Sequence, residues 1–173
     1  MRNAIVAAAA ACLAFSASHA LAQDMPTDPQ IAHIAYTAGV IDIDAAKLAL
    51  QKTSNSEIKT FAESMVKDHQ AVNDQALALV KKLDVTPENN DTSKALAKAA
   101  ETKKSELEGL SGAEFDKAYI TNEVAFHDQV LGALNTVLIP STQNAELKNL
   151  LETGYKLFQG HKMHAERVAS ELK

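Results

Sequence analysis

The chain has 173 residues and a formal net charge of −5 at pH 7. That length suits a single domain with a sizeable hydrophobic core. Neutralisation of phosphate charge supplies most of the affinity of proteins for nucleic acid, so a mildly acidic chain without a basic stripe is not expected to bind DNA or RNA.

The N-terminus has the three parts of a secretory signal peptide. A basic start, Met1-Arg2-Asn3, leads into an apolar run from Ala4 to Phe15, and the small-residue triplet Ala20-Leu21-Ala22 follows. The apolar run is too short to span a membrane. We therefore expect residues 1–22 to be a cleaved signal peptide and residues 23–173 to form one domain in the periplasm.

The single cysteine, Cys12, lies within this leader. A lipoprotein signal would use it, but the preceding Ala9-Ala10-Ala11 matches such a signal weakly. Without Cys12 the exported domain has no thiol, so no disulfide, iron–sulfur cluster or haem c is expected. No apolar run in residues 23–173 reaches about 18 residues, so no transmembrane segment is expected in the domain.

The exported part is predicted to be helical throughout, because helix-forming residues dominate it and no hairpin signal occurs. Asp28 followed by Pro29 predicts an N-cap and the first turn of a helix that runs to about Lys52. Ser54-Asn55-Ser56-Glu57 contains a capping box and predicts the start of a second helix, which ends near Leu83.

The second half of the domain has the same character. Residues 84–90 break the helical pattern, and a polar helix is expected from about Thr92 to Glu108. Ser111-Gly112-Ala113-Glu114 predicts another capping box, which opens a helix to Ile139. Pro140 is expected to end that helix. A last helix is predicted from about Gln143 to Leu172.

This order of elements predicts an all-α, ferritin-like four-helix bundle. Two long helical hairpins would be joined by a crossover segment that contains a short helix, as in bundles with one long connection. A short connection between the hairpins would instead favour a simple up-down-up-down bundle. The polar segment at residues 84–110 therefore decides between the two topologies.

Polar side chains fall on the apolar faces of all four long helices when residues are placed at about 100° intervals. Asp42 lies in the centre of the apolar stripe of the first helix, and His69 lies near the middle of the second. Glu123 and His127 share the apolar face of the fourth segment, four residues apart. His161 lies among the inward residues of the last helix.

Three other polar residues are expected to lie outside this set. Asp68 and His164 fall at the edges of their stripes, where they would contact the inward residues or the surface. His33 points away from the apolar stripe and is expected to face solvent.

Ionised groups buried in an apolar interior cost several kcal/mol, so the inward residues must hydrogen-bond one another, bind water or coordinate an ion. Carboxylates with imidazoles suit zinc, iron, manganese or copper, and bundle cores are known to hold such sites. The sequence therefore predicts one transition-metal site at Asp42, His69, Glu123, His127 and His161. Alternatively, each histidine is a structural group, and Glu123 with His127 is an ordinary pair one turn apart.

Two functions remain open from these residues. The first is a periplasmic metal-binding protein that buffers, senses or carries a transition metal. The second is a non-catalytic envelope protein, active in stress response or in contacts with an envelope partner, whose core polar groups are structural. Its oligomeric state is open under either hypothesis. Hydrolase chemistry is not expected, because no G-x-S-x-G motif and no cysteine nucleophile occur.

Three segments carry a resemblance to a known family: Phe61–His69, Tyr119–His127 and His161–Ala165. In these the chain resembles the exported bacterial family called domain of unknown function 4142, a ferritin-like group. The resemblance implies a ferritin-like fold and an envelope location. Di-iron ferritin-like proteins use Glu-x-x-His pairs. Here Val66 stands three residues before His69, and His161 three before His164, so a di-iron oxidoreductase is disfavoured. An enzyme is not the expected function, and any activity would be that of a degenerate metal-dependent oxidoreductase.

Overall fold

The computed structural model describes residues 25–172, and the expected signal peptide at residues 1–22 lies outside the described residues. The described part is helical and contains no strand, as the sequence predicts. In chain order the elements are α1 (Asp28–Lys52), α2 (Ser56–Lys82), α3 (Asp91–Glu108), α4 (Gly112–Ala133), the π-helix η1 (Leu134–Leu138), α5 (Ile139–Ser141) and α6 (Ala145–Glu171). None of the helices between residues 25 and 172 has the length and apolar character needed to cross a membrane.

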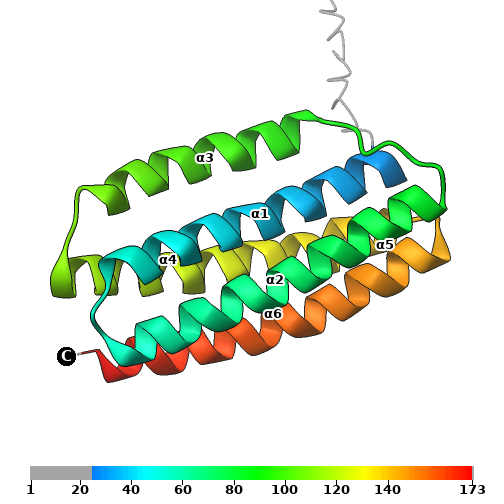
Figure 1. Cartoon of the computed structure of the whole chain (residues 1–173). Coiled ribbons are helices and arrows are strands. Elements are labelled where there is room, and N and C mark those ends of the chain that lie inside the picture. Colours follow the sequence, from blue (N-terminus) through cyan, green and yellow to red (C-terminus); the bar gives the residue numbers. More distant parts are fainter. Residues whose placement is uncertain (1–24, 173) are drawn as a thin grey trace, which may run out of the picture.

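The four long helices lie side by side in a bundle (Figure 1). Helix α1 packs against α2, α4 packs against α6, and contacts between α2 and α6 and between α1 and α4 join the two pairs. Helix α3 lies on the outside of α1 and occupies the connection between α2 and α4. As a result α2 and α4 run in the same direction along the bundle (Figure 1).

Helix α1 begins differently from the prediction. Thr27 is its N-cap, and Asp28 is already the first helical residue, so the prediction of Asp28 as the cap was wrong. The Asp28 carboxylate instead accepts the backbone N–H groups of Gln143 and Asn144, at 2.9 and 2.7 Å. This contact ties the first turn of α1 to the loop before α6.

The N-cap of α2 is Asn55, so the predicted capping box from Ser54 to Glu57 was also wrong. The Asn55 side-chain oxygen accepts the N–H groups of Glu57 and Ile58, at 2.9 and 3.2 Å. A short amide side chain at this position reaches two of the unpaired N–H groups of the first turn. Asn55 therefore caps α2 in place of Ser54, the cap that the motif predicted.

The fourth predicted helix is also interrupted. Ser111 is its N-cap but makes no capping hydrogen bond, so the predicted box with Glu114 was wrong. A π-helix, η1, follows α4, and the helical chain continues past Pro140 to Ser141. The proline ring would clash with the carbonyl four residues earlier in a regular α-helix, and the wider π turn precedes it. Pro140 therefore does not end the helix where the sequence predicted.

The apolar interior is divided into two clusters. The first apolar cluster lies toward the α1–α2 turn and contains Ala46, Ala49, Ile58, Phe61, Ala62, Met65, Leu107, Phe115, Tyr119, Ile120, Ala165 and Val168. The second apolar cluster lies toward the opposite end and contains Ile31, Ala32, Ile34, Ala38, Val130, Leu134, Leu138, Leu147, Leu151 and Phe158. Asp42, His69, Glu123, His127 and His161 fall at or near the boundary between these clusters, whereas the buried Asp116 follows Phe115 of the first cluster.

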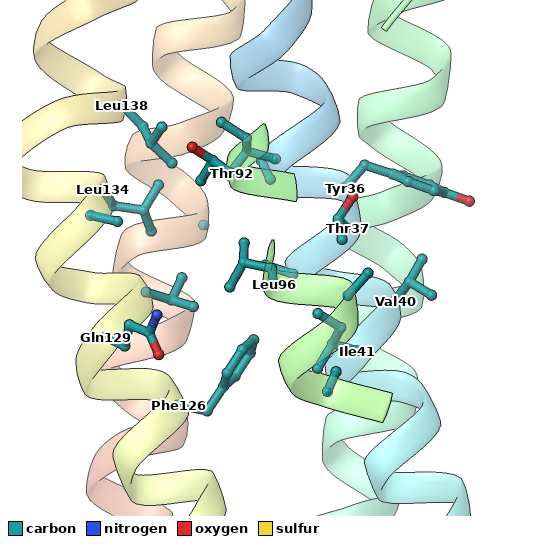
Figure 2. Close-up of a pocket in the computed structure, with 18 of the residues that line it drawn as sticks. Tyr36, Thr37, Val40, Ile41, Thr92, Leu96, Phe126, Gln129, Leu134 and Leu138 are labelled. Atoms are coloured by element: carbon teal, nitrogen blue, oxygen red, sulfur yellow. The ribbon is translucent and has the colours of Figure 1, made fainter. Parts of the chain in front are cut away.

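A groove of about 1480 Å³ runs between α3 and the bundle. Figure 2 shows Leu96 of α3 opposite Phe126 of α4 and Leu134 of η1. None of the five predicted metal ligands lines this groove. Phe158 does line it, and its ring also lies 4.8 Å from the His69 ring and 5.1 Å from the His127 ring, centre to centre. Phe158 therefore separates the groove from the buried polar groups.

Candidate metal centre

His69 lies at the centre of the buried polar groups. Its Nε2 atom is 3.4 Å from Asp42 Oδ2, and both side chains are 1% exposed. The same Nε2 is 3.1 Å from His161 Nδ1. One nitrogen of α2 therefore faces a carboxylate from α1 and an imidazole from α6.

The second nitrogen of His161 faces outward. His161 Nε2 lies 3.1 Å from Asp68 Oδ2, and the Asp68 side chain is 36% exposed. Because a carboxylate only accepts hydrogen bonds, His161 Nε2 is the protonated nitrogen. His161 Nδ1 then carries the lone pair that faces His69.

Helix α4 supplies Glu123 and His127 one turn apart. His127 Nδ1 donates to the backbone oxygen of Glu123 at 2.8 Å, which leaves the lone pair on His127 Nε2. That Nε2 atom is buried without a hydrogen-bond partner. Glu123 Oε2 lies 3.8 Å from His127 Nδ1 and is likewise buried and unpaired.

The structure brings all five predicted residues into one buried region, which we call the polar layer: Asp42, His69, Glu123, His127 and His161. Two groups in it have ligand atoms within 4.8 Å of one another and could hold a metal ion. One group is His69, His127 and His161, and the other is Asp42, Glu123 and His127. His127 belongs to both groups, so they form one continuous cluster.

Burial keeps the imidazoles neutral. It lowers the pKa of His69 to about 2, helped by the neighbouring His161 and His127. Burial also lowers the pKa of His127 to about 4, although the hydrogen bond to the Glu123 backbone opposes this. Burial lowers the pKa of His161 too, against the hydrogen bond with Asp68. Neutral imidazole is the form that binds metals.

Burial has the opposite effect on the two carboxyl groups. It raises the pKa of Asp42 well above its usual range, and the nearby Glu123 adds to the rise. It raises the pKa of Glu123 to about 8, despite a hydrogen bond with the Asn122 side chain. In metal-free protein at neutral pH, the contact between Asp42 and His69 is therefore between uncharged groups and is not an ion pair.

Two aromatic residues near the polar layer were not expected there. Tyr119 of α4 has a buried hydroxyl without a hydrogen-bond partner. Burial, followed by the charges of Glu123 and Asp42, raises its pKa. Phe158 contacts two of the histidines by its ring. Both residues come from helices that also carry polar-layer residues, and their contacts with that layer depend on helix packing that the sequence does not show.

The residues predicted to lie at the margin take different positions. Asp68 contacts His161, as described above. His164 packs against Phe61, with ring centres 5.2 Å apart. His33 is half-buried on α1, where Thr37 lies one turn away, and is in neither metal-capable group. Of the three, only Asp68 extends the hydrogen-bonded chain of the polar layer.

The family model of a domain of unknown function (DUF4142) matches residues 10–168. The chain belongs to this family. The match spans α1 to α4 and most of α6, and so includes all five residues of the polar layer in this DUF4142 chain. No curated protein matches the chain, and no solved structure matches it. The family description assigns no activity, so the chemistry of the polar layer is the guide to function.

Proposed function

We propose that the protein is a periplasmic, ferritin-like four-helix-bundle protein that binds one transition-metal ion in its core. The ion would be held by Asp42, His69, Glu123, His127 and His161. The role of such a site is to buffer, sense or carry the metal. Catalysis is not part of the proposal.

The unpaired atoms of the polar layer carry this proposal. Both carboxylate oxygens of Asp42, Oε2 of Glu123 and Nε2 of His127 are buried without hydrogen-bond partners. Buried polar groups in native proteins almost always have a partner. Each unpaired group costs about 1–3 kcal/mol. A bound cation would give all four atoms a partner at once.

The separations of the ligand atoms fit a metal ion. An ion about 2.1 Å from its ligands places neighbouring ligand atoms about 3.0 Å apart in an octahedral site and about 3.4 Å apart in a tetrahedral one. His69 Nε2 is 3.1 Å from His161 Nδ1 and 3.4 Å from Asp42 Oδ2. These three atoms would therefore need little rearrangement to share one ion.

A single ion fits better than two. A histidine bridges two metals only when both of its ring nitrogens are free. His127 Nδ1 is occupied by the backbone oxygen of Glu123, which leaves only Nε2 as a ligand. The Glu-x-x-His pairs of di-iron proteins are also missing at His69 and His164. The proposed centre is therefore mononuclear.

The donor set favours a borderline transition metal. Three imidazole nitrogens with oxygens from two carboxylates suit zinc, iron, manganese or copper. Calcium and magnesium prefer sites made of oxygen ligands. The layer is also neutral without metal, so ionisation of Asp42 and Glu123 would supply the negative charge that a divalent ion requires.

Helix order and the leader support the other parts of the proposal. The pairs α1–α2 and α4–α6, with α2 and α4 running in the same direction, match a bundle with one long crossover. The pattern of residues 1–22 supports export.

The test is elemental analysis with thermal melting of the purified protein. The wild type is expected to retain up to one equivalent of metal and to melt at a higher temperature when metal is added. A variant with His69→Ala and His161→Ala is expected to lose both properties. His33→Ala, which removes an imidazole outside the polar layer, is the control and should behave as the wild type.

The opposite result would point to a different function. If the wild type retains no metal and its melting temperature responds to no divalent ion, the metal proposal is wrong. The core histidines would then be structural groups, and the function to pursue would be a non-catalytic role among envelope proteins.

A further inference from the structure

His161 is the most exposed of the five residues of the polar layer. The side chains of Asp42 and His69 are 1% exposed and those of Glu123 and His127 are 1% and 0% exposed. His161 is 7% exposed, and its partner Asp68 is 36% exposed. Within residues 25–172, exposure of these contacting polar groups therefore increases from the core to Asp68.

These groups form an unbroken chain of contacts. Asp68 Oδ2 lies 3.1 Å from His161 Nε2, and His161 Nδ1 lies 3.1 Å from His69 Nε2. The His161 ring thus has one nitrogen at a solvent-exposed carboxylate and the other at the buried cluster. Rotation of this single side chain would connect the surface to the core.

From this chain we propose that Asp68 and His161 are the route by which the metal ion enters and leaves the core. Asp68 captures the hydrated cation at the surface, and His161 transfers it to His69 and Asp42. The inference rests on the proposed metal centre. It assigns to Asp68 a role in the rate of exchange, beyond orienting His161.

The other sides of the polar layer are unsuitable for a cation. The first and second apolar clusters cover it above and below along the bundle axis. Toward the groove it is covered by the Phe158 ring and by Asn122, a neutral amide that hydrogen-bonds to Glu123 and offers no charge to attract a cation. A partly dehydrated ion is strongly disfavoured among apolar side chains, because nothing there replaces its water. A chain of carboxylate and imidazole groups supplies ligands at each step.

The test is the rate of cobalt(II) uptake by the purified protein, followed by stopped-flow absorbance, with release measured by adding a chelator. Asp68→Asn keeps the size of the side chain and removes its charge. Both uptake and release are expected to slow, the uptake rate by roughly tenfold, the lower end of typical electrostatic effects on association. Asp68→Glu restores the carboxylate and should recover most of the rate.

The uptake and release rates of Asp68→Asn, taken together, show whether Asp68 lies on the route of the ion or only orients His161. A carboxylate that only orients His161 would leave uptake unchanged and speed release, with affinity reduced roughly 10–100-fold. That outcome contradicts the inference. Asp74→Asn is the matched control, because Asp74 is an exposed carboxylate of the same helix that pairs with Gln70. Equal slowing in Asp74→Asn would also contradict the inference.

A second measurement needs no variant. Uptake by the wild type should slow as sodium chloride is raised, because salt screens the attraction between the ion and an exposed carboxylate. A rate independent of salt would contradict capture at Asp68. If the wild type binds no cobalt(II) at equilibrium, the proposed metal centre itself is wrong. If it binds cobalt(II) but Asp68→Asn exchanges it at the wild-type rate, only the route is wrong.

Discussion

The first apolar cluster and the polar layer are neighbours in the same bundle, yet they are built in opposite ways. In the apolar cluster, the Tyr119 ring packs against the rings of Phe61 and Phe115, and the Tyr119 hydroxyl is its exception, a buried polar group without a partner. In the polar layer, several buried atoms have no partner. Burial therefore stabilises the fold in the first region and opposes ionisation in the second. This contrast indicates that the cluster serves stability and the polar layer serves binding.

The largest expected effect is on the apolar side of this comparison. Phe61→Ala removes a fully buried ring of the first apolar cluster. It should lower the free energy of unfolding by about 3–5 kcal/mol, as large-to-small core substitutions do. Chemical denaturation would measure the loss.

The control for Phe61→Ala is Leu77→Ala, which truncates a 46% exposed side chain of the same helix. It should change stability by less than about 0.5 kcal/mol. The folded Phe61→Ala protein should still gain stability from added metal. Loss of that gain would mean that the apolar cluster is part of the binding site, contrary to the proposed division.

A double variant of the polar layer should stabilise the metal-free protein, whereas Phe61→Ala destabilises it. Asp42→Asn with Glu123→Gln keeps the side-chain shapes and removes both ionisable groups. Metal-free stability at pH 8 should rise by roughly 1–4 kcal/mol, because both carboxyl groups ionise in the unfolded state while burial opposes their ionisation in the folded state, and amides carry no such penalty. The stabilisation by metal should disappear. Melting curves with and without zinc would measure both effects.

Asp44→Asn with Glu114→Gln is the matched control for that variant. It makes the same two types of substitution on the same two helices, at exposed positions. It should preserve the response to metal. A double polar-layer variant that is less stable than the wild type without metal would show that the carboxyl groups have structural partners.

The pH dependence sharpens the comparison further. Glu123 has a folded-state pKa of about 8 against an ordinary value of 4.5, so the folded state holds a proton that the unfolded state loses. Stability due to this proton is lost as pH rises between these values. His69 and His127 have the opposite effect on stability. Burial lowers their pKa values to about 2 and about 4, so the folded state loses stability as pH falls below 6.5.

Above pH 6.5 only the carboxyl effect remains. Metal-free stability should therefore fall between pH 6.5 and 8, by roughly 2 kcal/mol for Glu123, and the raised pKa of Asp42 acts in the same direction. Metal requires deprotonated ligands, so the increase in melting temperature on adding metal should grow over the same range. Denaturation curves at several pH values would test this, and Glu123→Gln should flatten the metal-free decline. A metal-free stability that rises above pH 6.5 would contradict the assigned protonation states.

The inward polar residues were predictable from the sequence because each long helix has a clear apolar stripe, and a stripe fixes which residues face the core. Asp42 and His69 are examples of residues placed correctly in this way. The convergence of five residues from four helices was not predictable with certainty, because stagger and rotation depend on packing. The resemblance of three segments to one family predicted the family that the match over residues 10–168 shows.

Local details were harder to predict because several residues compete for the same role. Ser54 and Asn55 could each cap α2, and only the backbone path selects Asn55. Asp28 does not cap α1 as predicted, because its carboxylate accepts hydrogen bonds from backbone N–H groups 115 and 116 residues further along the chain. The contact of Asp68 with His161 joins residues 93 apart in sequence, so no local pattern reveals it. The π-helix before Pro140 likewise depends on geometry that residue types alone do not specify.

The smallest predicted effect concerns the spacing of α1 and α2 beside the polar layer. Gly39 precedes Asp42 by one turn, and a Cβ added there would lie 2.3 Å from Oδ1 of the buried Asn73. Gly39→Ala gains about 1 kcal/mol in helix propensity but crowds the helix contact at a cost of about 1–3 kcal/mol. The crowding should prevail, with a net loss of about 1 kcal/mol measured by chemical denaturation. Gly160→Ala on α6 meets nothing within 4 Å and should instead be neutral or stabilising. If both variants gain stability, Asn73 moves freely, and the close approach of α1 and α2 does not set the spacing of the polar layer.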